Sequence, residues 1–161
     1  MTKLSAQDVT ILSELQSGTE DGRLKLAERL GMSSTTLWRR VNELKKSGVI
    51  RSEVTLLDPE KIGYPVCVFV FVNLKDYSVE TRTAFETVIE QAPEIMECYA
   101  VTGAHDYTLI VRSRSVRDFE RFLMDEILSH PGVESASSQI ALRQHKYTTA
   151  FPVEKSGPET P

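Results

Sequence analysis

Hydrophobic residues recur at helical spacing in three segments of the N-terminal third of the chain. The first predicted helix ends near residue 17, and Ser5 and Asp8 form a capping pattern at its start. A second short helix is predicted over 24–30, and a third runs from a hydroxyl cap at Ser33 or Ser34 to about Lys46. The inward-facing positions are Val9, Leu12, Leu15, Leu26, Ala27, Leu30, Leu37, Val41 and Leu44. Three helices with a short Gly-containing turn between the second and third predict a helix-turn-helix.

The segment after Gly48 changes character twice before the next apolar run. Residues 49–57 read as a strand, which would serve as a wing beside the helices or as a hinge. Residues 58–65 are rich in Pro and Gly and lack periodicity, so they mark the best domain boundary. The expected organisation is a helix-turn-helix domain over 1–50, a hinge strand and linker over 51–65, a second domain over 66–151 and a disordered tail over 152–161.

The second domain alternates strand and helix patterns. Strands are predicted over 66–72, 95–102, 107–112 and 133–142, helices over 79–91 and 116–127, a turn over 103–106, and a short extended piece over 147–151. The order β-α-β-β-α-β is the split, ferredoxin-like arrangement. The chain is therefore expected to be an α+β protein, with an N-terminal winged helix-turn-helix and a C-terminal ferredoxin-like domain.

The run 66–72 is apolar at every position, so both faces of this strand need cover. The domain's own helices can cover one face. In a domain this small, the simplest cover for the other is the same sheet of a second subunit, and a crossed-over tail is the alternative. We therefore expect the second domain to form dimers.

Charge is divided unevenly along the 161 residues. The net charge is −4. Residues 1–57 hold nine Lys/Arg and seven Asp/Glu, whereas residues 58–161 hold ten Lys/Arg and sixteen Asp/Glu. A basic face on the N-terminal unit is sufficient to engage phosphates. The N-terminus lacks the apolar core of a secretory signal, and Cys67 and Cys98 lie far apart without metal-ligand spacing. A cytoplasmic protein is expected.

The outward face of the third predicted helix carries the candidate chemistry for DNA. Between Thr36 and Arg51 there are five basic residues and one acid. Residues at the start of such a helix reach base edges, and Arg can bond guanine through two hydrogen bonds. Trp38 can pack on its own domain or lie on the sugar-phosphate backbone, and packing is favoured. The alternative for the cluster is a solvated charged helix face. The candidate contacts are Ser34, Thr35, Thr36 and Arg39 for bases, Lys45, Lys46 and Arg51 for phosphates, and Ser33, Trp38 and Arg40 beside them.

Many short segments resemble the Lrp/AsnC family of amino-acid-responsive regulators found in bacteria and archaea. They span residues 4–152 and include Asp8-Val9-Thr10-Ile11-Leu12, Gly22-Arg23, Leu26-Ala27, Arg39-Arg40-Val41, Gly48-Val49-Ile50, Leu57-Asp58-Pro59, Pro93-Glu94-Ile95-Met96, Val101-Thr102-Gly103-Ala104-His105-Asp106-Tyr107, Pro131-Gly132-Val133 and Lys146-Tyr147-Thr148-Thr149. The resemblance implies a DNA-binding regulator of amino-acid or related metabolism that forms dimers, often assembled into octamers. It also implies a small effector bound near the hairpin turn, at an interface between dimers.

The positions that match the family's effector site are Thr102, Gly103, Asp106 and Tyr107, with Tyr99, Ala104, Ser137, Ser138 and Gln139 nearby. A zwitterionic effector needs an anion for its ammonium group, which Asp106 can supply. Backbone N–H groups around Gly103 can bind its carboxylate. The residues alone favour the structural alternative, in which Gly103 serves only the turn and Asp106 only caps it.

Catalytic and metal-binding motifs are missing from the sequence. His105 stands beside Asp106, but adjacent strand residues point apart, and no GxSxG, HExxH or phosphate-binding loop accompanies them. The three histidines have no metal-ligand spacing. We therefore expect no enzyme activity, no metal and no cofactor. Two other classes explain less of the sequence. A stand-alone ligand-binding module would leave the basic helices unexplained, and a ferredoxin-like enzyme would need catalytic residues that the sequence lacks.

Overall fold

The computed structural model describes residues 3–18 and 22–154, with the side chains of 22–24 left aside. The chain divides into two compact units. One comprises Met1–Thr55 with Lys146–Pro161, and the other comprises Leu56–His145.

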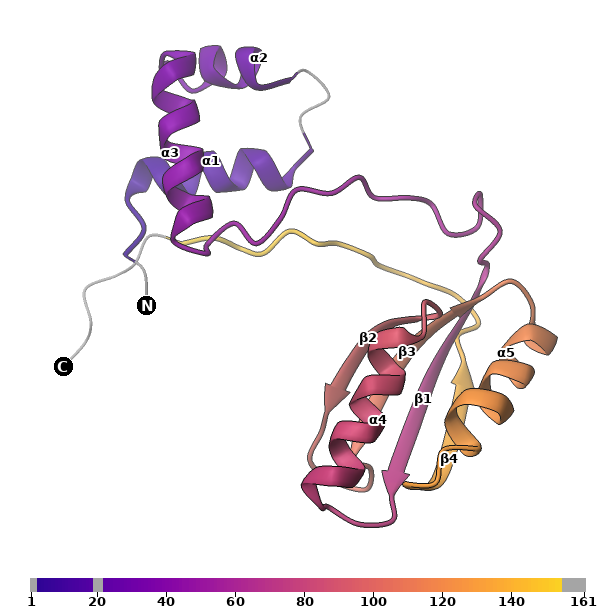
Figure 1. Ribbon diagram of the computed structural model, residues 1–161. Coiled ribbons are helices and arrows are strands. Elements are labelled where there is room, and N and C mark those ends of the chain that lie inside the picture. Colours follow the sequence, from indigo (N-terminus) through magenta and orange to yellow (C-terminus); the bar gives the residue numbers. More distant parts are fainter. Residues whose placement is uncertain (1–2, 19–21, 155–161) are drawn as a thin grey trace. The chain divides into compact units, whose positions relative to one another are not determined.

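The first unit contains the three predicted helices, α1 (Ala6–Gln16), α2 (Gly22–Arg29) and α3 (Ser34–Lys46) (Figure 1). Ser5 caps α1 through a complete capping box with Asp8, as the sequence predicts. The predicted apolar stripe of α1 is wrong at one position: Ile11 is fully buried, whereas Val9 is only half-buried. The shared core of this unit consists of Ile11, Leu12, Leu26, Ala27, Leu37, Val41 and Leu44.

The chain around this unit departs from the sequence prediction in two places. Residues 49–57 form no strand. The extended piece expected at 147–151 groups with the first unit, not the second. There the side-chain amide of Gln16 bonds the backbone N–H and C=O of Phe151, at 2.7 and 3.1 Å, and Val153 packs on the helical core. Of the tail expected at 152–161, residues 155–161 lie outside the described part.

The second unit follows the predicted β-α-β-β-α-β order. Its elements are β1 (Val66–Leu74), α4 (Val79–Gln91), β2 (Ile95–Ala100), β3 (Tyr107–Ser113), α5 (Val116–Phe122), the π-helical segment η1 (Leu123–Leu128) and β4 (Val133–Ile140). The strands form one antiparallel sheet in the order β2-β3-β1-β4. Sequence periodicity locates these elements because each is amphipathic or apolar over its own length.

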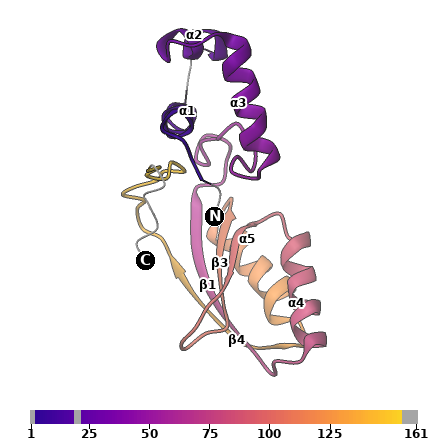
Figure 2. The ribbon, with the colours of Figure 1, turned by 90° about the vertical axis from the view of Figure 1, so that its left-hand side faces the viewer.

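Only one face of this sheet is covered within the unit. Figure 2 shows α4 and α5 on the same side of the strands. Val68, Val70 and Val72 of β1 are fully buried beneath these helices, whereas Phe69 is 36% exposed and Phe71 is half-buried on the opposite face. The second face of the predicted doubly apolar strand is therefore open in a single subunit. Its covering by a partner stays a prediction.

Candidate DNA-binding and effector sites

Helix α3 begins with a side-chain cap that fixes its first turn. The Ser33 Oγ accepts a hydrogen bond from the Thr36 N–H at 3.2 Å and lies 2.8 Å from the Thr36 hydroxyl oxygen. Ser34 and Thr35 are exposed beside this cap, whereas the Thr36 hydroxyl is engaged with Ser33. The exposed hydroxyls at the start of α3 are therefore presented on a rigid turn, as recognition of base edges requires.

The basic residues of α3 divide between its exposed face and its packed face. Arg39 is exposed and pairs with Glu43 one turn later, with 2.7 Å between the guanidinium and carboxylate. Arg40, a predicted DNA contact, instead turns toward α1, where its guanidinium lies 3.6 Å from the Asp8 carboxylate. The Arg40 side chain is only 32% exposed, and its Nε is buried without a hydrogen-bond partner. The structure thus places Arg40 between helices, where it holds α3 against α1.

The remaining predicted phosphate contacts lie near the C-terminal end of α3. Lys46 and Arg51 are exposed. The Lys45 ammonium group lies 2.6 Å from the Glu53 carboxylate, and DNA binding through Lys45 would have to compete with this pair. Such exposed pairs contribute only about 0.2–1 kcal/mol, so a phosphate can replace the carboxylate at small cost.

Trp38 does not pack on its own domain. Its side chain is 61% exposed, and the preference for packing is therefore wrong. The physical reason is its place one residue after the buried Leu37, since successive helical residues point about 100° apart. The exposed indole remains available to a sugar-phosphate backbone.

In the second unit, Asp106 ties the β2–β3 turn to the end of β1. Its carboxylate accepts hydrogen bonds from the Leu74 N–H at 2.8 Å and from the Tyr77 hydroxyl at 3.0 Å. Its backbone N–H donates to the Val72 carbonyl at 3.0 Å. The bond to Asp106 and the charge of its carboxylate raise the pKa of Tyr77. The capping alternative is thus realised, and Tyr77 is a neighbour that no sequence pattern indicated.

The rest of the turn is accessible from solvent. Thr102, Gly103 and Ala104 are exposed, and Gly103 has a φ of 125°, a conformation that only glycine adopts without strain. The space where a side chain at position 103 would lie is empty, with no heavy atom of a non-adjacent residue within 4 Å.

The other expected effector residues do not converge on one surface. Tyr107 is buried among the core residues and donates a hydrogen bond to the Glu86 carboxylate at 3.1 Å, while burial raises its pKa. Ser137 and Gln139 stand opposite Phe71 and Phe69, on the open face of the sheet. Two expected residues remain. Ser138 pairs with Val70 on the helix-covered face, and Tyr99 is 53% exposed opposite Thr108. Strand alternation separates these side chains, although the sequence places them close together.

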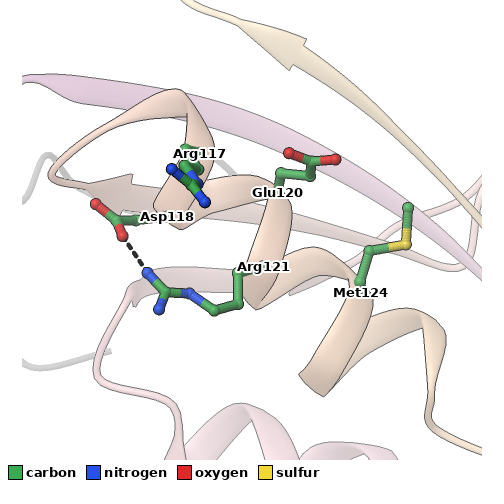
Figure 3. Close-up of a pocket in the computed structure, with 5 residues that line it drawn as sticks. All are labelled: Arg117, Asp118, Glu120, Arg121 and Met124. Atoms are coloured by element: carbon green, nitrogen blue, oxygen red, sulfur yellow. Dashed lines mark hydrogen bonds and ion pairs between the residues drawn. The ribbon is translucent and has the colours of Figure 1, made fainter.

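Two cavities lie around α5, away from the expected effector residues. One, of about 440 Å³, is lined by four charged residues of α5 and by Met124 of η1, and Figure 3 shows Arg121 reaching toward the Asp118 carboxylate there. The pKa of Asp118 is lowered, chiefly because its carboxylate accepts a hydrogen bond from the hydroxyl of Ser115, the cap of α5. The second cavity, of about 610 Å³, lies between α5 and the C-terminal end of α4. Within the described residues, no helix is long and apolar enough to cross a membrane.

Comparisons with known proteins agree with this two-unit architecture. Residues 67–151 match the model of the Lrp/AsnC ligand binding domain, and residues 4–51 match a winged helix-turn-helix DNA-binding model. The chain is 32% identical to the DNA-binding transcriptional activator DecR of Escherichia coli K12, over 91% of this chain and 97% of that protein. It is also 32% identical to the leucine-responsive regulatory protein of Haemophilus influenzae, over 90% and 87% of the two chains.

Solved structures give the same result. The complex of the Neisseria meningitidis transcriptional regulator NMB0573 with L-Met has a TM-score of 0.87 and 32% identity, covering 92% of this chain and 96% of that one. DecR and NMB0573 are regulators of transcription, a role that is not enzymatic. With a ligand-binding domain model over more than half of its length and a winged helix-turn-helix before it, the chain belongs to the Lrp/AsnC family of DNA-binding transcriptional regulators.

Proposed function

We propose that this protein is a sequence-specific regulator of genes for amino-acid or related metabolism, acting in the cytoplasm as a homodimer or an octamer of four dimers. The observation that carries the proposal is the outward face of α3. It presents Ser34, Thr35, Trp38 and Arg39 to solvent on a capped helix, while Leu37 and Val41 anchor its other side. An exposed, rigid, basic face is the form in which a recognition helix enters the major groove.

Dimerisation supplies the second recognition helix. The open face of the sheet exposes Phe69 and half-exposes Phe71 and Ile110. Phe69 of β1 stands directly opposite Ile110 of β3. Burial of this apolar surface against the same face of a partner would be favourable, at about 25 cal/mol per Å². Two reading helices on successive major grooves would then engage a pseudo-palindromic operator.

The proposed effector is a small amino acid or a related metabolite, bound beside the 102–107 turn at an interface between dimers. The structure of a relative with L-Met supports this ligand class. The backbone at Gly103 is open to a carboxylate, and each Asp106 oxygen accepts one hydrogen bond, which leaves lone pairs for an ammonium group. Linkage requires that DNA and effector alter each other's affinity by the same factor.

The test of DNA binding is a fluorescence anisotropy titration of the full-length chain with the DNA upstream of its own operon. We expect saturable binding that weakens steeply with salt, and at least tenfold preference over a scrambled duplex of equal length. If a folded dimer binds neither duplex at low salt, the proposal of a DNA-binding regulator is rejected. The alternative of a stand-alone ligand-binding module would then be favoured.

The effector is sought by a thermal-shift screen of the twenty amino acids, because a ligand that prefers the folded state raises the melting temperature. Asp106→Asn should abolish the shift, since Asn keeps an acceptor for the Leu74 N–H but loses the charge. Tyr77→Phe is the matched control, because it removes the hydroxyl that contacts Asp106 but leaves the carboxylate in place. An unchanged shift in Asp106→Asn would remove this carboxylate from the effector site.

A further inference from the structure

The second cavity is a separate place in the fold from the proposed effector turn. It lies at the C-terminal end of β3, where Ser113 is the last residue. Asp106 lies at the other end, directly before the first residue of this strand. Its walls come from α4, the turn before β2, the end of β3, α5, η1 and Tyr64, all within the second unit. At about 610 Å³ it falls within the size range of sites that hold small molecules.

One serine of this cavity has a side chain that no described residue hydrogen-bonds. Ser113 lines the cavity and is only 4% exposed, yet the described residues offer its side chain no hydrogen bond. This hydroxyl can therefore donate or accept a hydrogen bond with a molecule in the cavity. Apolar surface from Val88, Ala92 and Phe122 surrounds this position.

The charges of the cavity leave an excess of carboxylates. The Asp118 carboxylate is already engaged by the Ser115 hydroxyl at 2.6 Å and by Arg121. In the part of the chain that the structure describes, no ion pair includes the three other lining carboxylates, which belong to Glu94, Asp125 and Glu126.

One guanidinium opposes these three carboxylates. Arg114 lies 5.2 Å from the centre of the Tyr64 ring, in a cation–π contact at the rim. With the Asp118–Arg121 pair neutral, the lining carries three negative charges and one positive charge. The complementary ligand is therefore a dication whose charges are separated by an apolar stem.

We propose that this cavity binds an alkyl chain with an ammonium group at each end. The stem would lie on Val88 and Phe122, and the ammonium groups would meet the free carboxylates and the Ser113 hydroxyl. Linear diamines and basic amino acids share this chemistry. A basic amino acid adds one carboxylate, for which Arg114 is the cation at hand. This proposal concerns a second site and does not require the effector turn.

The experiment is isothermal titration calorimetry on the full-length chain at low ionic strength, without DNA. The probes are cadaverine, L-lysine and 1-aminopentane, which has the stem of cadaverine with one ammonium group. We expect cadaverine to bind at least about tenfold more tightly than 1-aminopentane, since the second ammonium group gains a charge-assisted hydrogen bond. If L-lysine binds more tightly than cadaverine, and this difference is lost in Arg114→Gln, the ligand class of the cavity is a basic amino acid. If cadaverine binds as tightly as L-lysine or more tightly, the ligand class of the cavity is a linear diamine.

The binding site is located by a pair of matched double variants. Glu94→Gln with Glu126→Gln should weaken cadaverine binding at least about tenfold. Glu90→Gln with Glu134→Gln removes the same charge from exposed positions of this unit outside the cavity, and should leave the affinity unchanged. Ser113→Ala should weaken binding about threefold or more.

Three outcomes overturn the proposal: no binding of either cadaverine or L-lysine, full affinity in the cavity double variant, or equal loss in both double variants. Full affinity in the cavity double variant would place the ligand at another site, such as the turn. Because no DNA is present, a failed DNA-binding experiment leaves this result unaffected.

Discussion

Replacement of Asp8 by Ala removes three contacts with one side chain. Its carboxylate accepts hydrogen bonds from the Ser5 N–H at 3.0 Å and the Ser5 hydroxyl at 2.6 Å, and it lies 3.6 Å from the Arg40 guanidinium. Loss of the capping interaction costs about 1 kcal/mol. Loss of the carboxylate that pairs with the part-buried Arg40 adds about 1 kcal/mol, because this ion pair is broken. The free energy of unfolding of the first unit should therefore fall by about 2 kcal/mol.

The assay is urea unfolding followed by the fluorescence of Trp38, the single tryptophan, which lies in α3 and so reports on the first unit. Asp8→Asn, which keeps an acceptor but loses the charge, should cost about half as much. Glu14→Ala is the control on the same helix. Its exposed pair with Arg29 at 3.0 Å should contribute less than about 0.5 kcal/mol.

The effect of Asp8 should also depend on pH. Burial raises the pKa of this carboxyl, but the hydrogen bonds from Ser5 and the charge of Arg40 outweigh burial and hold the pKa below its ordinary range. A group whose pKa is lower in the folded state stabilises the protein above its unfolded pKa, and this contribution is lost as the pH falls through the folded value. The difference between wild type and Asp8→Ala should be full at pH 7 and shrink below about pH 4. A loss no larger than that of Glu14→Ala, or one that persists undiminished at pH 2, would refute the reasoning.

Three further predictions concern DNA, assembly and the tail. Arg39→Ala should weaken binding to the operator more than to scrambled DNA, whereas Lys46→Ala should weaken both and reduce the salt slope by about 0.9; equal losses in anisotropy titrations would contradict this division. Phe69→Lys on the open sheet face should shift sedimentation from dimer to monomer, because it places like charges against each other in a symmetric interface, and an unchanged dimer would locate the interface elsewhere. Gln16→Ala removes both hydrogen bonds to Phe151, so hydrogen exchange at residues 150–153 should speed up about tenfold, with no change in α4; equal exchange in the two proteins would show that these bonds do not hold the tail.

The sequence alone determined the helices and most strands, because those signals are local. Capping at Ser5 and Ser33 is set by residues three positions apart, and the apolar spacing of the helices is set by one turn. The predicted range 79–91 therefore coincides with α4, and the order of elements in the second unit was correct. The strand expected at 49–57 did not form, because a strand depends on a neighbour that its own residues cannot supply.

Only the tertiary structure decided which side chains meet. Arg40 and Tyr107 were expected at binding sites, but packing between distant segments turned Arg40 toward Asp8 and Tyr107 into the core. The contact between Tyr77 and Asp106 joins residues that are 29 positions apart, and no periodicity encodes it. The sequence fixes the local conformation through short-range contacts, whereas the composition of a site depends on how the elements pack, which the whole fold decides.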